Sequence, residues 1–450
     1  MIAPTAGQPS MHRAGPGRDD WPMGQAAMLL TPAGGELLDR LRGIDVTPDK
    51  ALRLSAELRG QYPADLVAAA LTQQALRIAA REKFSRADEM FFTRSGLEQA
   101  SGERAAAHSA RRFAGLALVA DLCCGIGGDL TALARVTSRV LAVDADIESL
   151  HFAARNAAVY GASGRVSPVC ADVRDLRLAG IPAAFIDPAR RAGRRRLPAG
   201  ASSPPLSWCF AMAGDVPRVC VKAAPGLAHA LIPAGWEAEF VAVGRGLKEA
   251  LLWAPAFATT ARRATVLPAS PWTDGGNTAG RAPETTAGAG SIPVTDPILA
   301  TDQGPGAGHT MASDPHGAPP APVRAAGEYL LDPNPAVTRA GLVAELARQL
   351  DAWQLDPMIA FLSLDRPVRT PFARTLRVLA SLPWRERDVA AKLRELGVGS
   401  ADIRRRGLAG DVEQIHRRLG LRGDRTATIV LTRRDDRPWG LICEPQETRR

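Results

Sequence analysis

The chain has 450 residues, 46% of them hydrophobic, and a formal net charge of +9 at pH 7. This length predicts two or three domains with substantial cores, and no run of about 18 apolar residues is present that could span a membrane. The six cysteines lack the paired spacing of a zinc site, so we expect no bound metal and reduced thiols, as in a cytoplasmic protein.

The first 114 residues divide into two parts. Residues 1–34 are rich in Gly and Pro and lack a signal-peptide core, so we expect a disordered N-terminus in which Met23 and Met28 are alternative starts. Residues 35–114 carry apolar side chains at three- and four-residue spacing and few strand formers. This periodicity predicts a helical cap on the domain that follows.

The segment that begins at Asp121 reads Asp-Leu-Cys-Cys-Gly-Ile-Gly-Gly-Asp, between an apolar run and a helical pattern. A strand, a glycine turn and a helix start in this order predict a Rossmann-type ligand site, in which Cys123, Gly125 and Gly127 lie close to the ligand. Leu130 occupies the third glycine position of dinucleotide sites. An acid four residues before the first glycine is instead typical of S-adenosylmethionine (SAM) sites, where Asp121 can face the ammonium group.

Acidic residues also end the next three predicted strands, which are followed by Asp144, Asp172 and Asp187. We expect Asp144 and the adjacent Ala145 to hold the ribose of SAM. We expect Asp172 and the adjacent Val173 to hold its adenine amine. A single acid in such a place is more often a turn residue or a helix N-cap. Four in register at one edge of a parallel sheet favour a cofactor site.

The predicted sheet continues beyond Asp187. Five arginines lie in the loop 190–196, directly outside the carboxyl edge of the sheet. Further strands are predicted at 218–222, 239–243 and 249–253, and a short turn joins the last two. The fold class expected for residues 115–268 is therefore α/β, with the Rossmann-like seven-stranded sheet of class I methyltransferases and strand seven inserted antiparallel.

The C-terminal part of the chain predicts a linker and a small domain. Residues 269–327 are dominated by Gly, Pro, Ala, Thr and Asp without apolar periodicity, so we expect a disordered insert or linker. Residues 328–445 predict a helix at 336–350 and then the order β-α-β-α-β-β, a small α+β domain.

Most of the excess positive charge lies at the C-terminal end. Residues 371–450 hold 18 Lys and Arg against 11 Asp and Glu, including Arg404, Arg405 and Arg406. A basic module of this kind suits a polyanionic substrate. A genome that favours arginine would also produce such a solvated basic face, so charge alone leaves both interpretations open.

Many short pieces of the sequence occur in a recognisable order. They are Tyr62-Pro-Ala-Asp-Leu-Val, Lys83-Phe84, Phe92-Thr-Arg-x-Gly-Leu-Glu-Gln, the glycine motif, Asn156-Ala-Ala-Val-Tyr-Gly, Asp187-Pro-Ala-Arg-Arg, Ser203-Pro-Pro-Leu-Ser, Gly327-Glu-Tyr-Leu, Asp332-Pro-Asn-Pro-Ala-Val, Thr370-Pro-Phe-Ala-Arg and Leu421-Arg-Gly-Asp. Together they resemble a bacterial family of class I SAM-dependent methyltransferases with a C-terminal THUMP-like domain, over about residues 35–268 and 327–445. The stretch from the glycine motif to Gly161 is also similar to trimethylguanosine synthases and related guanine-N2 RNA methyltransferases. THUMP domains bind RNA, so the resemblance implies an RNA substrate, tRNA or rRNA.

One departure from these families affects the expected chemistry. Enzymes that methylate base nitrogens usually carry Asp/Asn-Pro-Pro-aromatic after strand four, where the acid and the proline carbonyl hold the amine and the ring stacks on the base. Here Asp187 and Pro188 are kept, but the aromatic position is Arg190. Either another ring (Phe91, Phe92 or Trp208) stacks on the base, or Arg190 stacks through its guanidinium plane, or the acceptor is not a base nitrogen.

The sequence therefore predicts a cytoplasmic SAM-dependent methyltransferase acting on structured RNA, with Asp187, Pro188 and Arg190 at the reaction centre. The residues expected to contact RNA are Phe92, Arg191, Arg194, Trp208, Arg404, Arg405 and Arg406. Two alternatives remain open, a non-catalytic RNA-binding protein on a methyltransferase scaffold and a small-molecule methyltransferase. A nicotinamide-dependent oxidoreductase is disfavoured by the missing third glycine. The RNA species, the modified atom and the oligomeric state are left undetermined.

Overall fold

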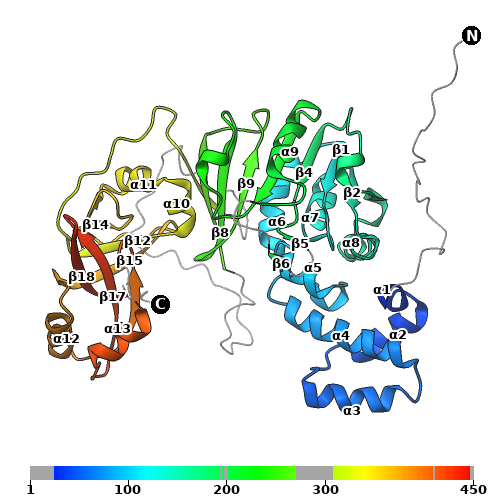
Figure 1. Ribbon diagram of the computed structural model, residues 1–450, viewed down its shortest axis with the longest axis horizontal. Helices are drawn as coiled ribbons and strands as arrows, with labels where there is room; N and C mark the ends of the chain where they lie inside the picture. Colours follow the sequence, from blue (N-terminus) through cyan, green and yellow to red (C-terminus); the bar gives the residue numbers. More distant parts are fainter. Residues whose placement is uncertain (1–24, 193–194, 197–200, 270–307, 409–410, 446–450) are drawn as a thin grey trace, which may run out of the picture. The chain divides into compact units, whose positions relative to one another are not determined.

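A computed structural model describes residues 25–192, 195–196, 201–269, 308–408 and 411–445. Within these residues the chain forms two compact units (Figure 1). The N-terminal unit contains the described parts of 25–234 together with 251–257, and the C-terminal unit contains 235–250, 258–269 and 308–445.

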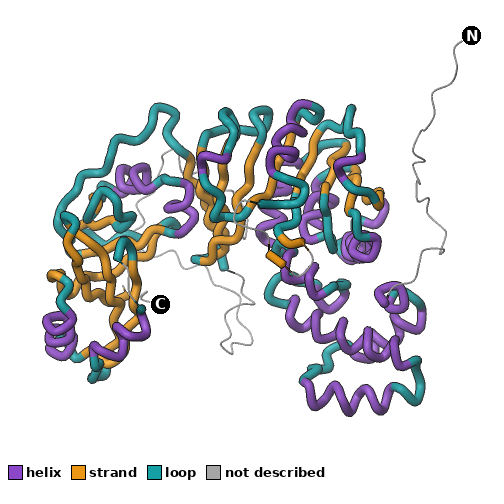
Figure 2. The backbone as a smooth tube through the Cα atoms, viewed as in Figure 1, coloured by secondary structure: helices purple, strands orange, loops and turns teal. Residues whose placement is uncertain are grey.

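The N-terminal unit begins with helices and continues as alternating strands and helices. Its elements are α1 (Gln25–Leu29), α2 (Pro32–Leu41), α3 (Pro48–Leu58), α4 (Ala64–Ala80), α5 (Arg94–Gln99), α6 (Glu103–Ala110), β1 (Leu118–Leu122), α7 (Gly128–Val136), β2 (Arg139–Asp144), α8 (Ile147–Val159), β3 (Val166–Cys170), β4 (Ala183–Ile186), β5 (Arg191–Ala192), β6 (Arg195–Arg196), α9 (Leu206–Ala211) and β7 (Arg218–Ala223). Figure 2 shows the region before β1 as helices and connecting loops, which confirms the predicted N-terminal helices.

The remaining elements follow in chain order. They are β8 (Glu237–Val243), β9 (Gly246–Trp253), β10 (Arg262–Leu267), β11 (His309–Ala312), β12 (Tyr329–Pro333), α10 (Pro335–Ala340), α11 (Val343–Leu350), β13 (Trp353–Gln354), β14 (Leu362–Leu364), β15 (Ala373–Pro383), α12 (Glu386–Glu395), β16 (Val398–Arg405), α13 (Val412–Leu419), β17 (Arg425–Arg434) and β18 (Arg437–Pro445). The predicted order β-α-β-α-β-β is confirmed from β15 to β18.

The larger sheet has the strand order β11-β10-β8-β9-β7-β4-β1-β2-β3. Strands β3, β2, β1, β4 and β7 pair in parallel, so their carboxyl ends share one edge. Strand β4, in the interior of the sheet, is buried along its whole length. The α/β fold class is confirmed, and β9 lies between β8 and β7, where strand seven was expected.

The sheet has nine strands rather than the expected seven. The added strands are β10, which pairs parallel to β8, and β11, which pairs antiparallel to β10. Residues 308–327 were expected to be disordered, so this part of the linker prediction was wrong; residues 270–307 lie outside the described part. Only Met311 of β11 is buried, because a short edge strand contributes one face to the core, and this leaves little apolar periodicity to detect.

Two helix boundaries also differ from expectation. Residues 25–34 were expected to be disordered but contain α1 and the start of α2, while residues 1–24 lie outside the described part. Thr31 caps α2 by accepting a hydrogen bond from Gly34 N at 3.1 Å. The helix expected at 336–350 is interrupted at Gly341, whose φ of +70° ends α10 before α11 begins.

The smaller sheet has the order β13-β14-β12-β15-β18-β17-β16. Helices α12 and α13 pack on β16, and α10 packs on β8 and β10. Across the described residues, every helix is too short or too polar to cross a bilayer.

Candidate functional site

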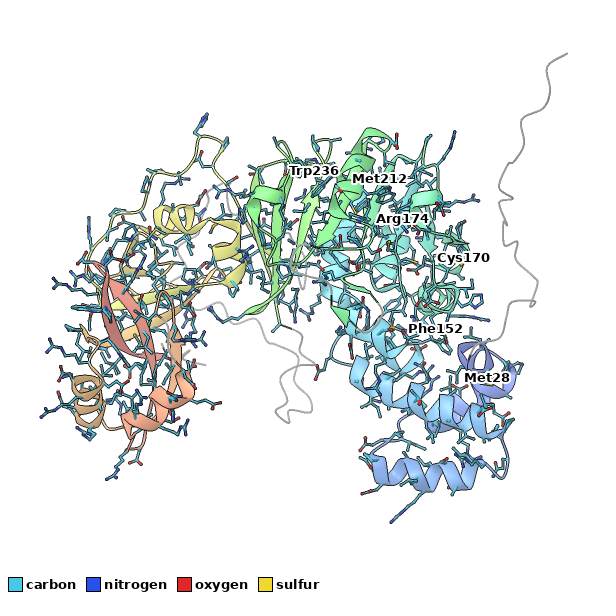
Figure 3. All side chains as sticks on the ribbon, in the orientation of Figure 1. Met28, Phe152, Cys170, Arg174, Met212 and Trp236 are labelled. Atoms are coloured by element: carbon cyan, nitrogen blue, oxygen red, sulfur yellow. The ribbon has the colours of Figure 1, made fainter. Side chains whose placement is uncertain are left out.

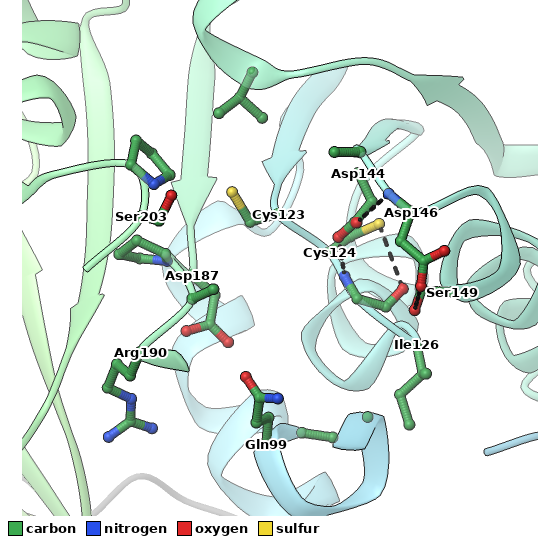
Figure 4. A pocket seen from close by; sticks show the side chains of 18 of the residues that line it. Gln99, Cys123, Cys124, Ile126, Asp144, Asp146, Ser149, Asp187, Arg190 and Ser203 are labelled. Atoms are coloured by element: carbon green, nitrogen blue, oxygen red, sulfur yellow. Dashed lines mark hydrogen bonds between the residues drawn. The ribbon is translucent and has the colours of Figure 1, made fainter. Parts of the chain in front are cut away.

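A pocket of about 380 Å³ lies at the carboxyl ends of the parallel strands (Figure 4). Its wall comes from the glycine turn, from the ends of β2, β3 and β4, and from α5. The lining residues are Ser95, Gly96, Gln99, Ala100, Cys123, Cys124, Gly125, Ile126, Gly128, Asp129, Asp144, Ala145, Asp146, Ser149, Ala171, Asp172, Val173, Arg174, Asp187, Pro188, Ala189, Arg190, Ser203 and Pro204. Nine of the predicted site residues are thus brought together: Cys123, Gly125, Asp144, Ala145, Asp172, Val173, Asp187, Pro188 and Arg190.

Two hydrogen bonds connect the glycine turn to the end of β2. Gly125 N donates to Asp144 Oδ2 at 2.8 Å, and Cys124 N donates to the Val143 carbonyl at 3.0 Å. Gly125 has a φ of +53°, and a Cβ there would meet no protein atom within 4 Å. The space beside Gly125 is therefore pocket space, which a side chain would take from a ligand. Cys123 also lies in the left-handed region, with a φ of +63°, and burial raises the pKa of its thiol.

Gly127 allows close packing of two helices and does not line the pocket. It is absent from the lining residues, and a Cβ at this position would lie 2.9 Å from Ala153 Cα in α8. Its φ of +86° starts α7. In this turn the second glycine allows α7 and α8 to approach each other, and its contact with the cofactor stays a prediction.

Asp144 and Asp172 differ in their surroundings. Asp144 Oδ1 accepts from Asp146 N at 2.9 Å, and burial raises the pKa of Asp144 although its backbone hydrogen bonds oppose this. Asp172 is more exposed and forms an ion pair with Arg174, with Oδ2 and Nη2 2.5 Å apart. The hydrogen bonds from the Arg174 side chain lower the pKa of Asp172 to about 2. Asp172 is therefore a carboxylate at neutral pH.

Lys222, at the end of β7, makes the buried ion pairs of the site. Its Nζ donates to Ser101 Oγ at 2.5 Å and to Asp129 Oδ2 at 2.8 Å, and it also contacts Asp187 Oδ2. The Lys222 side chain is 3% exposed and the Asp187 side chain 24%. All three ammonium hydrogens thus have partners, and Lys222 holds Asp187 at the inner wall of the pocket. Burial raises the pKa of Asp187, and the Lys222 charge opposes that rise.

Asp121 lies beneath the pocket rather than in its wall. The residue is 1% exposed, and within the described part of the chain neither carboxyl oxygen has a hydrogen-bond partner. Burial raises its pKa well above the usual range, and the charges of Asp129 and Asp187 add to this. Asp121 is not among the lining residues, and its direct contact with a ligand stays a prediction. Asp129 lines the pocket instead, and its Oδ1 is likewise without a described partner.

Helix α5 forms the wall that was not predicted. Ser95, Gln99 and Ala100 line the pocket, and Figure 4 shows Gln99, Asp187 and Arg190 pointing into the same space. A Cβ on Gly96 would lie 2.4 Å from Ile126 Cγ2, so glycine permits α5 to lie directly against the glycine turn. This wall could have been predicted from the motif that ends at Gln99, because the motif is one of the pieces shared with the methyltransferase family although it precedes the sheet.

The aromatic residues proposed to stack on a base do not line the pocket. Phe92 is 2% exposed, and its ring lies 5.8 Å from that of Phe84, so the predicted RNA contact of Phe92 was wrong. Phe91 stacks on Phe152, labelled in Figure 3, with 5.5 Å between ring centroids. Trp208 is half-buried on α9 and is not among the lining residues. Of the stacking candidates, Arg190 alone is among the described lining residues.

The other predicted RNA contacts lie elsewhere. The side chain of Arg191 and all of Arg194 lie outside the described part. Arg405 is exposed near the end of β16. Arg404 and Arg406 form ion pairs with the buried carboxylate of Asp332, at 3.3 Å and 3.0 Å.

Comparison with known proteins agrees with this geometry. Family profiles match residues 116–196 (RNA cap guanine-N2 methyltransferase), 373–445 (THUMP domain-like) and 23–80 (a domain of unknown function). Two relatives from strains of Mycobacterium tuberculosis, each described as an uncharacterized S-adenosylmethionine-dependent methyltransferase, are 34% identical over 357 residues, which cover 77% of this chain and 85% of each relative. A crystal structure from Porphyromonas gingivalis, provisionally named a methyltransferase, shares the fold with a TM-score of 0.64 at 18% identity, covering 89% of this chain and 99% of that one.

Proposed function

Because the chain belongs to the S-adenosylmethionine-dependent methyltransferases, we propose that it transfers the methyl group of SAM to a nucleotide of structured RNA, either tRNA or rRNA. The observation that carries the proposal is the continuity of one pocket, in which Gly125 and Asp144 adjoin Asp187 and Arg190. The matches to an RNA cap guanine-N2 methyltransferase and a THUMP-like domain support RNA as the acceptor. We propose a cytoplasmic location, where such RNAs are found.

The pocket residues fit SAM. Open space beside Gly125 leaves room for the ligand, and the carboxylate of Asp144, which lines the pocket, would hold the ribose hydroxyls. Asp172 would hold the adenine amine. The unsatisfied Oδ1 of Asp129 would accept from the ammonium group. An acid-rich wall also suits a cation, and SAM supplies an electrophilic methyl group on a positively charged sulfur.

The acceptor would meet the protein at Asp187, Pro188 and Arg190. Asp187 would accept a hydrogen bond from an N–H of the acceptor, orient its lone pair and take up the proton released after transfer. The Lys222 ammonium keeps Asp187 in place and opposes its protonation. Arg190 would stack its guanidinium plane on the base, in the position that an aromatic ring occupies in related enzymes.

Incubation of the purified enzyme with tritiated SAM and separate pools of tRNA and rRNA tests the proposal. We expect label in one RNA class, and mass spectrometry of its nucleosides identifies the modified base. Asp187→Asn should lower the rate of transfer by about 100-fold or more, while SAM affinity measured by calorimetry stays within about threefold.

Two results would contradict the proposal. Methyl transfer to a small molecule, with no transfer to either RNA pool, would show that the acceptor is a small molecule and not RNA. Binding of RNA and SAM without transfer to any RNA, including RNA from a strain lacking the gene, would favour the non-catalytic scaffold.

A further inference from the structure

Three arginines converge on one buried carboxylate in the C-terminal unit. Asp332, at the end of β12, is 2% exposed. Arg245 Nη2 lies 2.7 Å from Asp332 Oδ2, Arg404 Nη1 3.3 Å from the same oxygen, and Arg406 Nη2 3.0 Å from Oδ1. The arginines come from the β8–β9 turn, from β16 and from the residue after it. One carboxylate cannot neutralise three guanidinium groups.

A fourth arginine adds to this excess. Arg374 is the cross-strand neighbour of Asp332 in the pairing of β12 with β15. Its closest carboxylate is Asp402, with Nη2 and Oδ2 3.9 Å apart, and Asp402 already accepts from Arg404 Nε at 2.9 Å. Within the described residues, Arg374 Nε and Nη2 have no hydrogen-bond partner. Four cations thus share two carboxylates, an excess of two positive charges.

The cluster is partly desolvated but still open to solvent. The side chains of Arg245, Arg374, Arg404 and Arg406 are between 25% and 35% exposed. Burial lowers the pKa of Arg245 and of Arg374, and the neighbouring arginines lower both further. A network that served stability alone would be expected to balance its charges, since crowded like charges repel at close range.

The missing counter-charge has the chemistry of a phosphate group. Guanidinium groups present parallel N–H donors that match the oxygens of phosphate, and several converging on one point bind such an anion more tightly than scattered surface charges. A further hydrogen bond fixes the turn that carries Arg245, because Asn334 Nδ2 donates to the carbonyl of the adjacent Gly244 at 2.9 Å. The Asp332-Pro-Asn motif therefore holds the β8–β9 turn and its arginine against the smaller sheet.

We propose that Arg245, Arg374, Arg404 and Arg406, arranged around Asp332, form a binding site for a phosphate group. Its occupant is a backbone phosphate of the polynucleotide substrate, an assignment that rests on the proposed function, whereas the phosphate chemistry does not. Asp332 acts as the internal partner that assembles the arginines, and Arg374 supplies the charge left for the ligand.

Titration of the full-length protein with inorganic phosphate, at constant ionic strength maintained with chloride, tests the site. We expect calorimetry to show one phosphate per chain and thermal unfolding to shift upward with phosphate. Arg374→Met should weaken phosphate binding about tenfold or more. The matched control is Arg377→Met, because Arg377 lies on the same strand but is 61% exposed and pairs with Glu444; it should bind phosphate like the wild type.

A structural role for Arg374 predicts a different pattern. In that case Arg374→Met would lower the melting temperature equally with and without phosphate, and that result, or an absence of phosphate binding, overturns the proposal. If Arg374 binds phosphate, Arg374→Met should be at least as stable as the wild type in phosphate-free buffer, because one repelling charge is removed. The same variant should no longer be stabilised by added phosphate.

Competition with RNA identifies the source of the phosphate. Displacement of inorganic phosphate by a short RNA, together with weaker RNA binding by Arg374→Met, supports the polynucleotide backbone. Binding of phosphate that RNA does not displace supports a site for a small phosphorylated ligand and removes the RNA assignment. Neither result depends on methyl transfer, so failure of the proposed function is distinguishable from failure of the site.

Discussion

Lys222 determines the charge balance beneath the pocket. It contacts Asp129 and Asp187, and Asp121 lies nearby without a hydrogen-bond partner among the described residues. Removing one partner of a buried ion pair leaves the other charge without compensation, which is worse than removing both. The stability of this region and the position of Asp187 should therefore depend on the same side chain.

We expect Lys222→Met to lower the free energy of unfolding by about 3–5 kcal/mol, measured by urea denaturation. Lys248→Met, at an exposed position on β9, is the control and should change it by less than about 0.5 kcal/mol. The double variant Lys222→Met/Asp187→Asn should recover part of the loss. If Lys222→Met were as stable as the control Lys248→Met, the ion-pair assignment would be contradicted.

Asp121 should make stability depend on pH. Its pKa is raised above the ordinary value of 3.8, so between 3.8 and the folded-state pKa the folded protein holds a proton that the unfolded chain releases. Stability therefore falls as pH rises through this window. Asp121→Asn removes this contribution, so the free energy of unfolding of the variant minus that of the wild type should increase from pH 4 to pH 7.

Denaturant unfolding at several pH values measures this difference. Asp215→Asn, at an exposed position, controls for the loss of a surface carboxylate. A difference between Asp121→Asn and the wild type that stays constant across pH would show that Asp121 is not the group responsible.

At the scale of elements, strand β11 shows how a short edge strand contributes to the core. Met311 is fully buried, and Ser313 Oγ, just after the strand, accepts from Arg262 N at 3.1 Å. We expect Met311→Ala to destabilise the protein by about 2–5 kcal/mol, whereas Met358→Ala, at a residue 76% exposed, should have little effect. Urea denaturation of both variants decides this, and equal stability would mean that β11 does not pack on the sheet.

Local pattern allowed the elements of the parallel sheet to be predicted. The strands around Asp121, Asp144 and Asp187 were found because apolar runs, the glycine turn and acidic strand ends are all properties of neighbouring residues. The burial of Phe92 could not be predicted, because the same aromatic motif occurs both in protein cores and on binding surfaces. Lys222 was missed because its pairing with Asp187 exists only once β7 lies beside β4, and sequence spacing does not show which strands become neighbours.

At the scale of the whole molecule, the arginines near the end of β16 differ in their surroundings. Arg404 and Arg406 are engaged by Asp332, so replacing them would change stability together with binding. Arg405 is exposed on the same strand, so its side chain is accessible to RNA and serves as the probe. Contacts with phosphates release counterions, so RNA affinity should fall steeply as salt increases.

Arg405→Ala should weaken RNA binding similarly across sequences and reduce the slope of log K against log salt by about 0.7–0.9, with SAM affinity unchanged. Filter binding across a salt series measures both quantities. Arg59→Ala, at an exposed position in the N-terminal helices, is the control and should leave the slope unchanged. An unaltered slope in Arg405→Ala would remove this residue from the RNA contact.

The half-buried thiol of Cys123 has a consequence for the durability of the enzyme. Cys123 lines the pocket in which an activated methyl group would be held, and a thiolate is a far stronger nucleophile than a thiol. Since burial raises its pKa, the sulfur stays protonated and competes poorly with the acceptor. With SAM bound beside this soft nucleophile, the protonated thiol would protect the enzyme from methylating, and so inactivating, itself.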